Sequence, residues 1–240
     1  MSDTVLSFLL GVIQGLTEFL PISSSAHLLL PSLLFGFNDL GLSFDIAVHA
    51  GTLIAVIYYF RKEIALMFKS FLLTDVNLLP HRNLAISLIV ATIPIILAGL
   101  FVKDFIDERV FNIEHIAIAN IIFAGILLFA YLKRKDIKNL YSVTLYSALF
   151  VGVFQSLALF PGASRSGTAI TAALLLGFNL KDASKFSFML GIPTIFGALV
   201  LLIIEMQSTL EAFNYMNLII GFFISMIIAF LTIKLLSLIH

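Results

Sequence analysis

Long apolar runs separated by short polar segments form the main pattern of this chain. A membrane-spanning helix needs about 20 mostly apolar residues, with a range of roughly 17–25. The runs that meet this length are residues 44–60, 84–102, 115–132, 186–204 and 216–235. The pattern therefore predicts an all-α polytopic membrane protein with about five full transmembrane helices.

Two further apolar stretches are broken in the middle. Residues 5–37 are interrupted at 21–25, and residues 144–178 are interrupted at 161–167, in both cases by proline and serine. Each break leaves two helices that are too short to cross a bilayer, and irregular backbone survives at membrane depth only where protein or a wet cavity surrounds it. We therefore expect two re-entrant helical hairpins, each entering and leaving on one side.

The two broken stretches also resemble each other in sequence. The matched positions, after one deletion, are 11–16 with 152–157, Pro21 with Pro161, Ser24 with Ser164, Phe44 with Phe186 and Thr52 with Thr194. Three full spans separate the copies, so they should point in opposite directions. Inverted repeats with interrupted helices place a binding site where the half-helix ends meet. We expect one membrane domain over residues 1–240, with repeat 1 over about 1–132 and repeat 2 over about 144–240.

Composition supports this class. Hydrophobic residues make up 60% of the chain and charged residues 12%, whereas a soluble domain has about 25% charged residues. This excludes a soluble globular domain. The 14 basic and 14 acidic residues balance, so no nucleic-acid partner is expected. The chain has no cysteine, which excludes thiolate metal sites and thiol nucleophiles.

The basic residues predict an orientation. If both hairpins return to their own side, nearly all Lys and Arg residues share one face, and only Lys103 and Arg109 lie on the other. The positive-inside rule makes the crowded face cytoplasmic. The N-terminus is then expected outside.

The first hairpin tip carries a carboxylate at membrane depth. Gln14 and Glu18 are four residues apart and share a helix face, and Pro21 ends the first half-helix nearby. Glu18 then lies at a helix C-terminus, where the dipole disfavours negative charge. A cation or an arginine is expected to compensate it.

The serines that follow suit the start of the second half-helix. Ser23, Ser24 and Ser25 can cap it, and its free amides attract an anion. His27 would lie in its first turn, near Ser24. Taken singly, Ser23 and Ser25 are more often packing residues in membrane helices.

The second tip supplies the arginine. Ser164, Arg165, Ser166 and Thr168 stand at a second helix start, and an ionised residue at the bilayer centre costs about 2.5–3.5 kcal/mol on insertion scales. Arg165 should therefore meet Glu18 or a bound anion, and with the hydroxyls it forms a plausible phosphate cradle. Two simpler readings stay open: the pair as structural glue and Ser166 as a packing residue. His49 could equally be an interfacial histidine or a site residue.

At these two tips the chain resembles the undecaprenyl-diphosphate phosphatase family of bacterial membrane enzymes, the type linked to bacitracin resistance. Its first signature, a Glu or Gln four residues before a Glu and then a Pro–Ser–Ser stretch and a His, stands here as residues 14–27. Its second, Pro-Gly-x-Ser-Arg-Ser-Gly, stands as residues 161–167. The likeness covers most of the chain. Three features depart from the family. Gln14 stands in place of an acidic residue, and Ala169 stands where a threonine is frequent. Relatives usually have one more span after the fifth, so repeat 2 is expected to lack its last helix.

The resemblance implies hydrolysis of undecaprenyl diphosphate to undecaprenyl phosphate and phosphate in the bacterial inner membrane, with Mg²⁺ as the divalent cation and Ca²⁺ as the alternative. It implies that Glu18 is the acidic residue tied to metal binding or catalysis and that Arg165 binds phosphate. Ser24 and His27 correspond to the catalytic pair. The expected substrate-binding residues are Gln14, Ser23, Ser25, Ser164, Ser166, Thr168 and His49.

Several alternatives stay open at this stage. Ser24 could attack phosphorus with His27 as base, His27 could attack directly, or it could assist a metal-activated water. A polyprenyl-phosphate transporter or flippase is the rival function, because secondary transporters share this architecture. The expected partners are a polyprenyl diphosphate lipid and the surrounding membrane lipid, with a homodimer left open.

Overall fold

The computed structural model describes residues 2–107, 113–206 and 214–239, with side chains except at 102–107, 205–206 and 239. Every regular element in these ranges is a helix, apart from one isolated bridge between Lys138 and Phe178. The helices that are long and apolar enough to cross a membrane are α3 (Gly41–Tyr59), α5 (Leu79–Asp107), α6 (Ile113–Lys133), α9 (Leu180–Met206) and α10 (Tyr215–Ile239). The prediction of an all-α polytopic membrane protein with five spans is confirmed.

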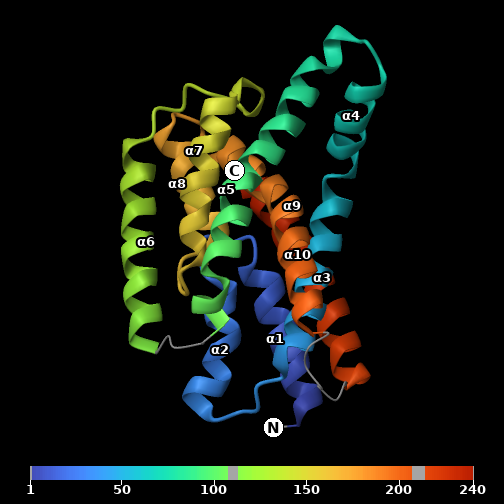
Figure 1. The fold of residues 1–240 in the computed structure, drawn as a ribbon, viewed down its shortest axis with the longest axis vertical. Coiled ribbons are helices and arrows are strands. Elements are labelled where there is room, and N and C mark those ends of the chain that lie inside the picture. The colour runs from blue at the N-terminus through green and yellow to red at the C-terminus, as the bar shows by residue number, and fades with distance from the viewer. Residues whose placement is uncertain (1, 108–112, 207–213, 240) are drawn as a thin grey trace.

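Both predicted breaks are present. The first separates α1 (Asp3–Thr17) from α2 (Ser24–Phe35), and the second separates α7 (Leu145–Ser156), extended by the short helix η3 (Leu157–Leu159), from α8 (Arg165–Leu175). In Figure 1, α1 and α2 occupy the lower half of the molecule and α7 and α8 the upper half. The two hairpins thus approach the middle from opposite ends, while their re-entrant position in a bilayer stays a prediction.

A helix that directly follows the first full span was not predicted from the sequence. The chain continues from α3 into α4 (Arg61–Leu72) with Phe60 as the only residue between them, and the short helix η1 (Val76–Leu78) leads into α5. Arg61 and Lys62 break the apolar pattern but are good helix formers, so they end the apolar run without ending helical backbone. In the loop before α7 lies the short helix η2 (Leu140–Ser142).

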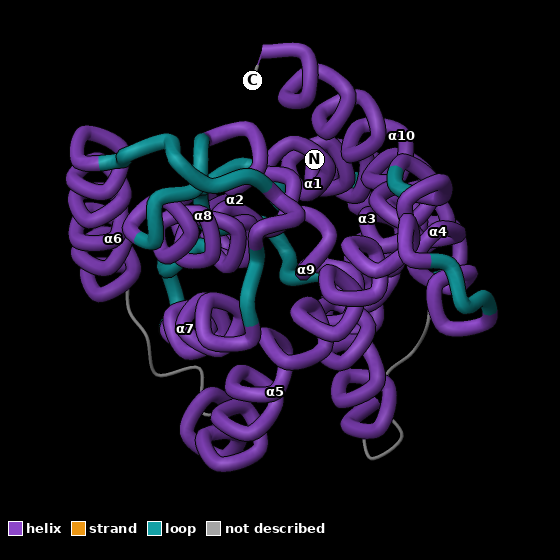
Figure 2. The backbone as a smooth tube through the Cα atoms, turned by 90° about the horizontal axis from the view of Figure 1, so that it is seen from above, coloured by secondary structure: helices purple, strands orange, loops and turns teal. Residues whose placement is uncertain are grey.

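The two halves of the chain interlock. Helix α1 packs on α10, and in the same way α7 packs on α5, so each hairpin rests on a long helix from the other half. Seen from above, α6, α7 and α8 lie on one side and α3, α4 and α10 on the other, with α9 between them (Figure 2). The division into inverted repeats agrees with this symmetry and stays a prediction. Of the two basic residues expected on the outer face, Lys103 and Arg109, neither has a described side chain.

Helices α3 and α10 cross closely at Gly51, which has no side chain. A Cβ atom added at Gly51 would lie 2.3 Å from the Phe222 carbonyl oxygen and 2.3 Å from Ser225 Oγ. The Ser225 hydroxyl donates to the Val48 carbonyl oxygen at 2.9 Å. Small residues let membrane helices approach this closely, so Gly51 sets the distance between α3 and α10.

We expect Gly51→Ala to destabilise the protein. Overpacking typically costs about 1–3 kcal/mol, because the added methyl group meets backbone that cannot turn aside. The measurement is the unfolding temperature in detergent, which should fall by several degrees. Gly125→Ala is the matched control: it is also helical, and an added Cβ there meets nothing within 4 Å. Equal unfolding temperatures for the two variants would contradict the role of Gly51.

Candidate active site

The two hairpin tips contact each other directly. The Leu20 carbonyl oxygen, in the first tip, accepts hydrogen bonds from Ser166 Oγ at 2.6 Å and from Ser164 Oγ at 3.3 Å. A Cβ added at Gly167 would lie 3.5 Å from Pro21 Cα. Ser166, expected to bind substrate, is fully buried, and its hydroxyl holds the tips together.

Two helices begin beside these contacts, as the sequence predicted. Ser23 Oγ accepts from the Ala26 amide at 3.4 Å at the start of α2, and Ser164 Oγ accepts from the Gly167 amide at 3.1 Å at the start of α8. Helix N-termini carry free amides and positive potential. Ser25 lies within 3.2 Å of Ser23 through their hydroxyl oxygens.

A buried ion pair joins the tips. Arg165 Nη2 lies 3.2 Å from Glu18 Oε1, and the side chains are 13% and 6% exposed. Arg165 Nη1 also donates to the Ser187 carbonyl oxygen on α9 at 3.4 Å. A Cβ at Gly191 would lie 2.8 Å from Nη1, so the guanidinium rests against the backbone of α9. The expected compensation of Glu18 by Arg165 is thus present.

The second oxygen of Glu18 lies close to several polar side chains. Oε2 accepts from Gln14 Nε2 at 3.0 Å and from Ser24 Oγ at 2.8 Å. His49 Nε2, from α3, lies 3.9 Å from the same oxygen, while its Nδ1 lies 2.8 Å from the Asp45 carbonyl oxygen. Glu18 is therefore the centre of the site.

The structure does not place His27 in the position that a Ser24–His27 pair needs. His27 Nδ1 lies 2.6 Å from the Ser23 carbonyl oxygen, whereas the Ser24 hydroxyl donates to Glu18. A carbonyl oxygen only accepts hydrogen bonds, so Nδ1 is the donor. The local geometry of a helix first turn favours this bond over one to a neighbouring side chain.

A cavity of about 220 Å³ opens on this group. Its polar lining consists of Glu18, Ser23, Ser24, Ser25, His49, Ser164, Arg165 and Thr194. Gln14, Ser166, Thr168 and His27 are not among the described lining residues; the Thr168 hydroxyl donates to the Arg165 carbonyl oxygen at 2.9 Å. The sequence did not single out Thr194 as a site residue, although its repeat match with Thr52 was a usable signal.

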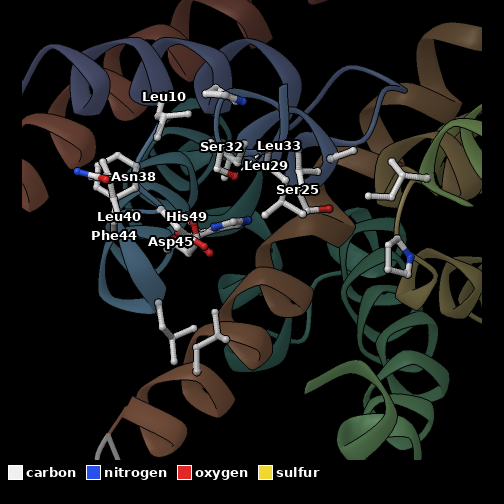
Figure 3. A pocket seen from close by; sticks show the side chains of 18 of the residues that line it. Leu10, Ser25, Leu29, Ser32, Leu33, Asn38, Leu40, Phe44, Asp45 and His49 are labelled. Atoms are coloured by element: carbon white, nitrogen blue, oxygen red, sulfur yellow. Dashed lines mark hydrogen bonds between the residues drawn. The ribbon is translucent and has the colours of Figure 1, made fainter. Parts of the chain in front are cut away.

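A second cavity, of about 520 Å³, is lined by residues of α2 and α3 among others (Figure 3). Ser25, His49 and Ala158 line both. The first cavity combines a carboxylate, a hydroxyl, a guanidinium and two helix starts. This set can bind a phosphate group and bring a hydroxyl close to it.

The residues around Glu18 also determine whether the site could bind a divalent cation. Among the described residues there is no group of three or more His, Cys, Asp and Glu side chains that could hold a metal ion. However, Gln14 Oε1 is buried and has no hydrogen-bond partner among the described residues, and it belongs to the residue beside Glu18. Mg²⁺ is usually bound through one or two carboxylates together with substrate phosphates and water. The residues fit a cation that arrives with a phosphate ligand.

The ion pair yields a stability prediction. Removing one partner of a buried pair typically costs about 3–5 kcal/mol, because the other charge is left uncompensated. We expect Arg165→Met to lower the unfolding temperature in detergent, and adding Glu18→Gln to this variant to restore much of the loss. Arg134→Met, which breaks a more exposed pair with Asp136, is the control. Additive losses in the double variant would contradict the coupling.

Comparisons with known proteins show the family of this chain. The family described as "Bacitracin resistance protein BacA" matches residues 7–239. An undecaprenyl-diphosphatase of Saccharophagus degradans is 49% identical over 194 residues, which cover 80% of this chain and 73% of that protein. The family match spans both hairpins and the residues around Glu18, and this chain therefore belongs to the BacA family of bacitracin resistance proteins.

Proposed function

We propose that this chain hydrolyses undecaprenyl diphosphate to undecaprenyl phosphate and inorganic phosphate, which recycles the lipid carrier for cell-wall synthesis. The relative at 49% identity is an undecaprenyl-diphosphatase, and the family match covers nearly the whole chain. The observation that carries the proposal is the double contact of Glu18, whose two oxygens bind Arg165 and Ser24. A phosphate-binding group and a hydroxyl thus stand on either side of one carboxylate.

Arg165 and the two helix starts are suited to hold the terminal phosphate. The guanidinium has five N–H donors, of which the contacts to Glu18 and to the Ser187 carbonyl oxygen use two. The first residues of α2 and α8 line the same cavity, and the starts of helices offer free amides to an anion. Charge-assisted hydrogen bonds of this kind are about twice as strong as neutral ones.

Ser24 is the hydroxyl best placed to attack. In this mechanism Ser24 Oγ bonds to the terminal phosphorus, the hydroxyl proton leaves along the hydrogen bond to Glu18 Oε2, and the phosphoanhydride bond breaks. Undecaprenyl phosphate departs, and water then hydrolyses the phosphoserine. Its support is the 2.8 Å contact between Ser24 and Glu18. Detection of phosphate on Ser24 would establish this route, and full turnover by Ser24→Ala would exclude it.

A divalent cation completes the proposal. Glu18 and the Gln14 amide oxygen would hold Mg²⁺ together with the diphosphate, and Ca²⁺ is the alternative. The ion would neutralise negative charge on the phosphates. Support comes from Gln14 Oε1, which is buried and accepts no hydrogen bond from the part of the chain that the structure describes.

The protein is a multi-pass membrane protein, and we place it in the bacterial inner membrane with its N-terminus outside. The basic residues of α4 and of the loop before α7 support this orientation. In Figure 1 both lie at the upper end of the molecule and the N-terminus lies at the lower end.

Phosphate release in detergent tests the activity. We expect the wild type to release phosphate from a polyprenyl diphosphate, and Arg165→Ala and Ser24→Ala to lose at least about a hundredfold, the scale for removing one donor that stabilises a transition state. Arg134→Ala and Ser142→Ala, both outside the cavity, should retain activity. A transporter without phosphatase activity would release no phosphate, so its absence from the folded wild type would favour the flippase alternative.

Metal removal tests the cation. A chelator should abolish phosphate release, and added Mg²⁺ should restore it. In a binding measurement, Mg²⁺ together with methylenediphosphonate should raise the unfolding temperature of the wild type and not that of Glu18→Gln. Unchanged turnover in chelator would refute the cation.

A further inference from the structure

One polar side chain beside the reacting groups has no role in the mechanism proposed above. The cavity of about 220 Å³ at Glu18 is called here the phosphate cavity. Among its described lining residues, helix α9 supplies Thr194, Ile195 and Ala198, of which Thr194 has a polar side chain. Thr194 is 8% exposed. Glu18 and Ser24 line the same cavity from the first tip, so α9 brings a hydroxyl-bearing residue to the space where the chemistry is proposed.

A buried glutamine lies next to Thr194. Thr194 Oγ1 lies 3.4 Å from Gln155 Oε1 and donates to the Leu190 carbonyl oxygen at 2.8 Å. Gln155, on α7, is 0% exposed, and its Nε2 donates to the Ala91 carbonyl oxygen on α5 at 3.5 Å. A carbonyl oxygen only accepts hydrogen bonds, so the amide nitrogen faces Ala91 and the amide oxygen faces Thr194. Gln155 thus links α5 and α9 beside a residue of the cavity wall.

The first half of the chain has the same arrangement with a different polar group. Gln14 and Gln155 occupy matching positions of the predicted repeats, and both are 0% exposed. Gln14 Nε2 donates to Glu18 Oε2 at 3.0 Å, whereas Gln155 contacts Thr194. Glu18 and Thr194 both line the phosphate cavity. In each half a fully buried glutamine therefore supports one polar residue of this cavity, which indicates a function for Thr194 in the site.

The contacts of Thr194 determine what its hydroxyl can offer to a ligand. A hydroxyl has one proton and two lone pairs, and the two groups beside Oγ1, the Leu190 carbonyl and the Gln155 amide oxygen, are both acceptors. They occupy the proton, so a lone pair is what Oγ1 has left for a further ligand. Phosphate oxygens need donors, and Arg165 and the helix starts are the donors suited to them. A lone pair suits a water molecule, which can donate.

We propose that Thr194 accepts a hydrogen bond from the water molecule that attacks phosphorus, and that Gln155 is the positioning residue that keeps the Thr194 hydroxyl in this orientation. The inference rests on the proposed function and on its phosphoserine route. In the second step the water oxygen bonds to phosphorus, and the bond between phosphorus and Ser24 Oγ breaks. Glu18 returns its proton to Ser24 Oγ, and both protons of the water leave with the phosphate, as H₂PO₄⁻.

Removing the Thr194 hydroxyl should slow the second step and spare the first. Thr194→Val keeps the shape of the side chain and removes the acceptor. With farnesyl diphosphate labelled at its terminal phosphate, rapid-quench measurements should show a stoichiometric burst of farnesyl phosphate, with the label held on the protein. Phosphate release should then be about ten- to a hundredfold slower than in the wild type, because misplacing a reacting group by about 1 Å costs this much. Thr194→Ser, which keeps the hydroxyl, should release phosphate at a rate near that of the wild type.

Thr232→Val is the matched control. Thr232, on α10, is 7% exposed and donates to the carbonyl oxygen four residues earlier at 2.9 Å, as Thr194 does at 2.8 Å. It is not among the described residues that line the phosphate cavity. This variant should show neither the burst nor slower phosphate release.

A double variant tests the positioning role of Gln155. Gln155→Met removes the amide oxygen beside Thr194 and should also produce the burst, with a smaller decrease in the rate of phosphate release. Because Gln155 acts through Thr194, adding Gln155→Met to Thr194→Val should slow phosphate release no further. A further decrease in the double variant would contradict this role. Unfolding temperatures in detergent establish that each variant is folded, and if Thr194→Val is not, the burst in Gln155→Met decides the same question.

Failure of this inference differs from failure of the proposed function. Equal slowing of both products in Thr194→Val, without label on the protein, would overturn the role of Thr194. The same burst in Thr232→Val would also overturn it. If the folded wild type releases neither farnesyl phosphate nor phosphate, the proposed function fails and the role of Thr194 fails with it.

Discussion

The ion pair between Glu18 and Arg165 is the constraint on which the rest of this structure depends. Each charge alone would be costly at membrane depth, and each is carried by a different hairpin. The charges can therefore meet only if the two tips approach from opposite ends and touch. The contact of Ser164 and Ser166 with the Leu20 carbonyl oxygen keeps them touching. Packing of α1 on α10 and of α7 on α5 holds both hairpins in place behind their tips.

The sequence could predict whatever depends on local pattern or on a single strong constraint. Apolar length gave the five spans, proline and serine gave the two breaks, and the buried charge of Glu18 pointed to Arg165. The sequence could not predict which group accepts a hydrogen bond from a given serine hydroxyl. Ser24 bonds to Glu18 rather than to His27, and Ser166 bonds to the other tip, because these choices depend on tertiary distances that spacing does not encode. Helix α4 was missed for another reason, since charged residues end an apolar run and not a helix.

In the predicted repeat alignment, the two copies carry different charged residues at their tips. The position of Glu18 corresponds to Leu159 in the second repeat, and the position of Arg165 corresponds to Ser25 in the first. Neither repeat carries both charges at its tip, so each half leaves a charge that only the other half can neutralise. The same asymmetry extends to the neighbouring helices: α8 is packed tightly through its alanines, whereas α2 has leucines at the matching places. The helix that follows the second tip is thus closely packed, whereas the helix that follows the first tip borders the cavities.

Glu18 also explains how a guanidinium inside a membrane protein can be stable before an anionic substrate binds. Without a counterion, a buried arginine would be strongly unfavourable. In the proposed mechanism the phosphate would bind the guanidinium donors that Glu18 and the Ser187 carbonyl oxygen do not use. The other oxygen of the carboxylate contacts Gln14 and Ser24. The pair that stabilises the fold would therefore keep the carboxylate next to the proposed attacking hydroxyl and the guanidinium next to the phosphate.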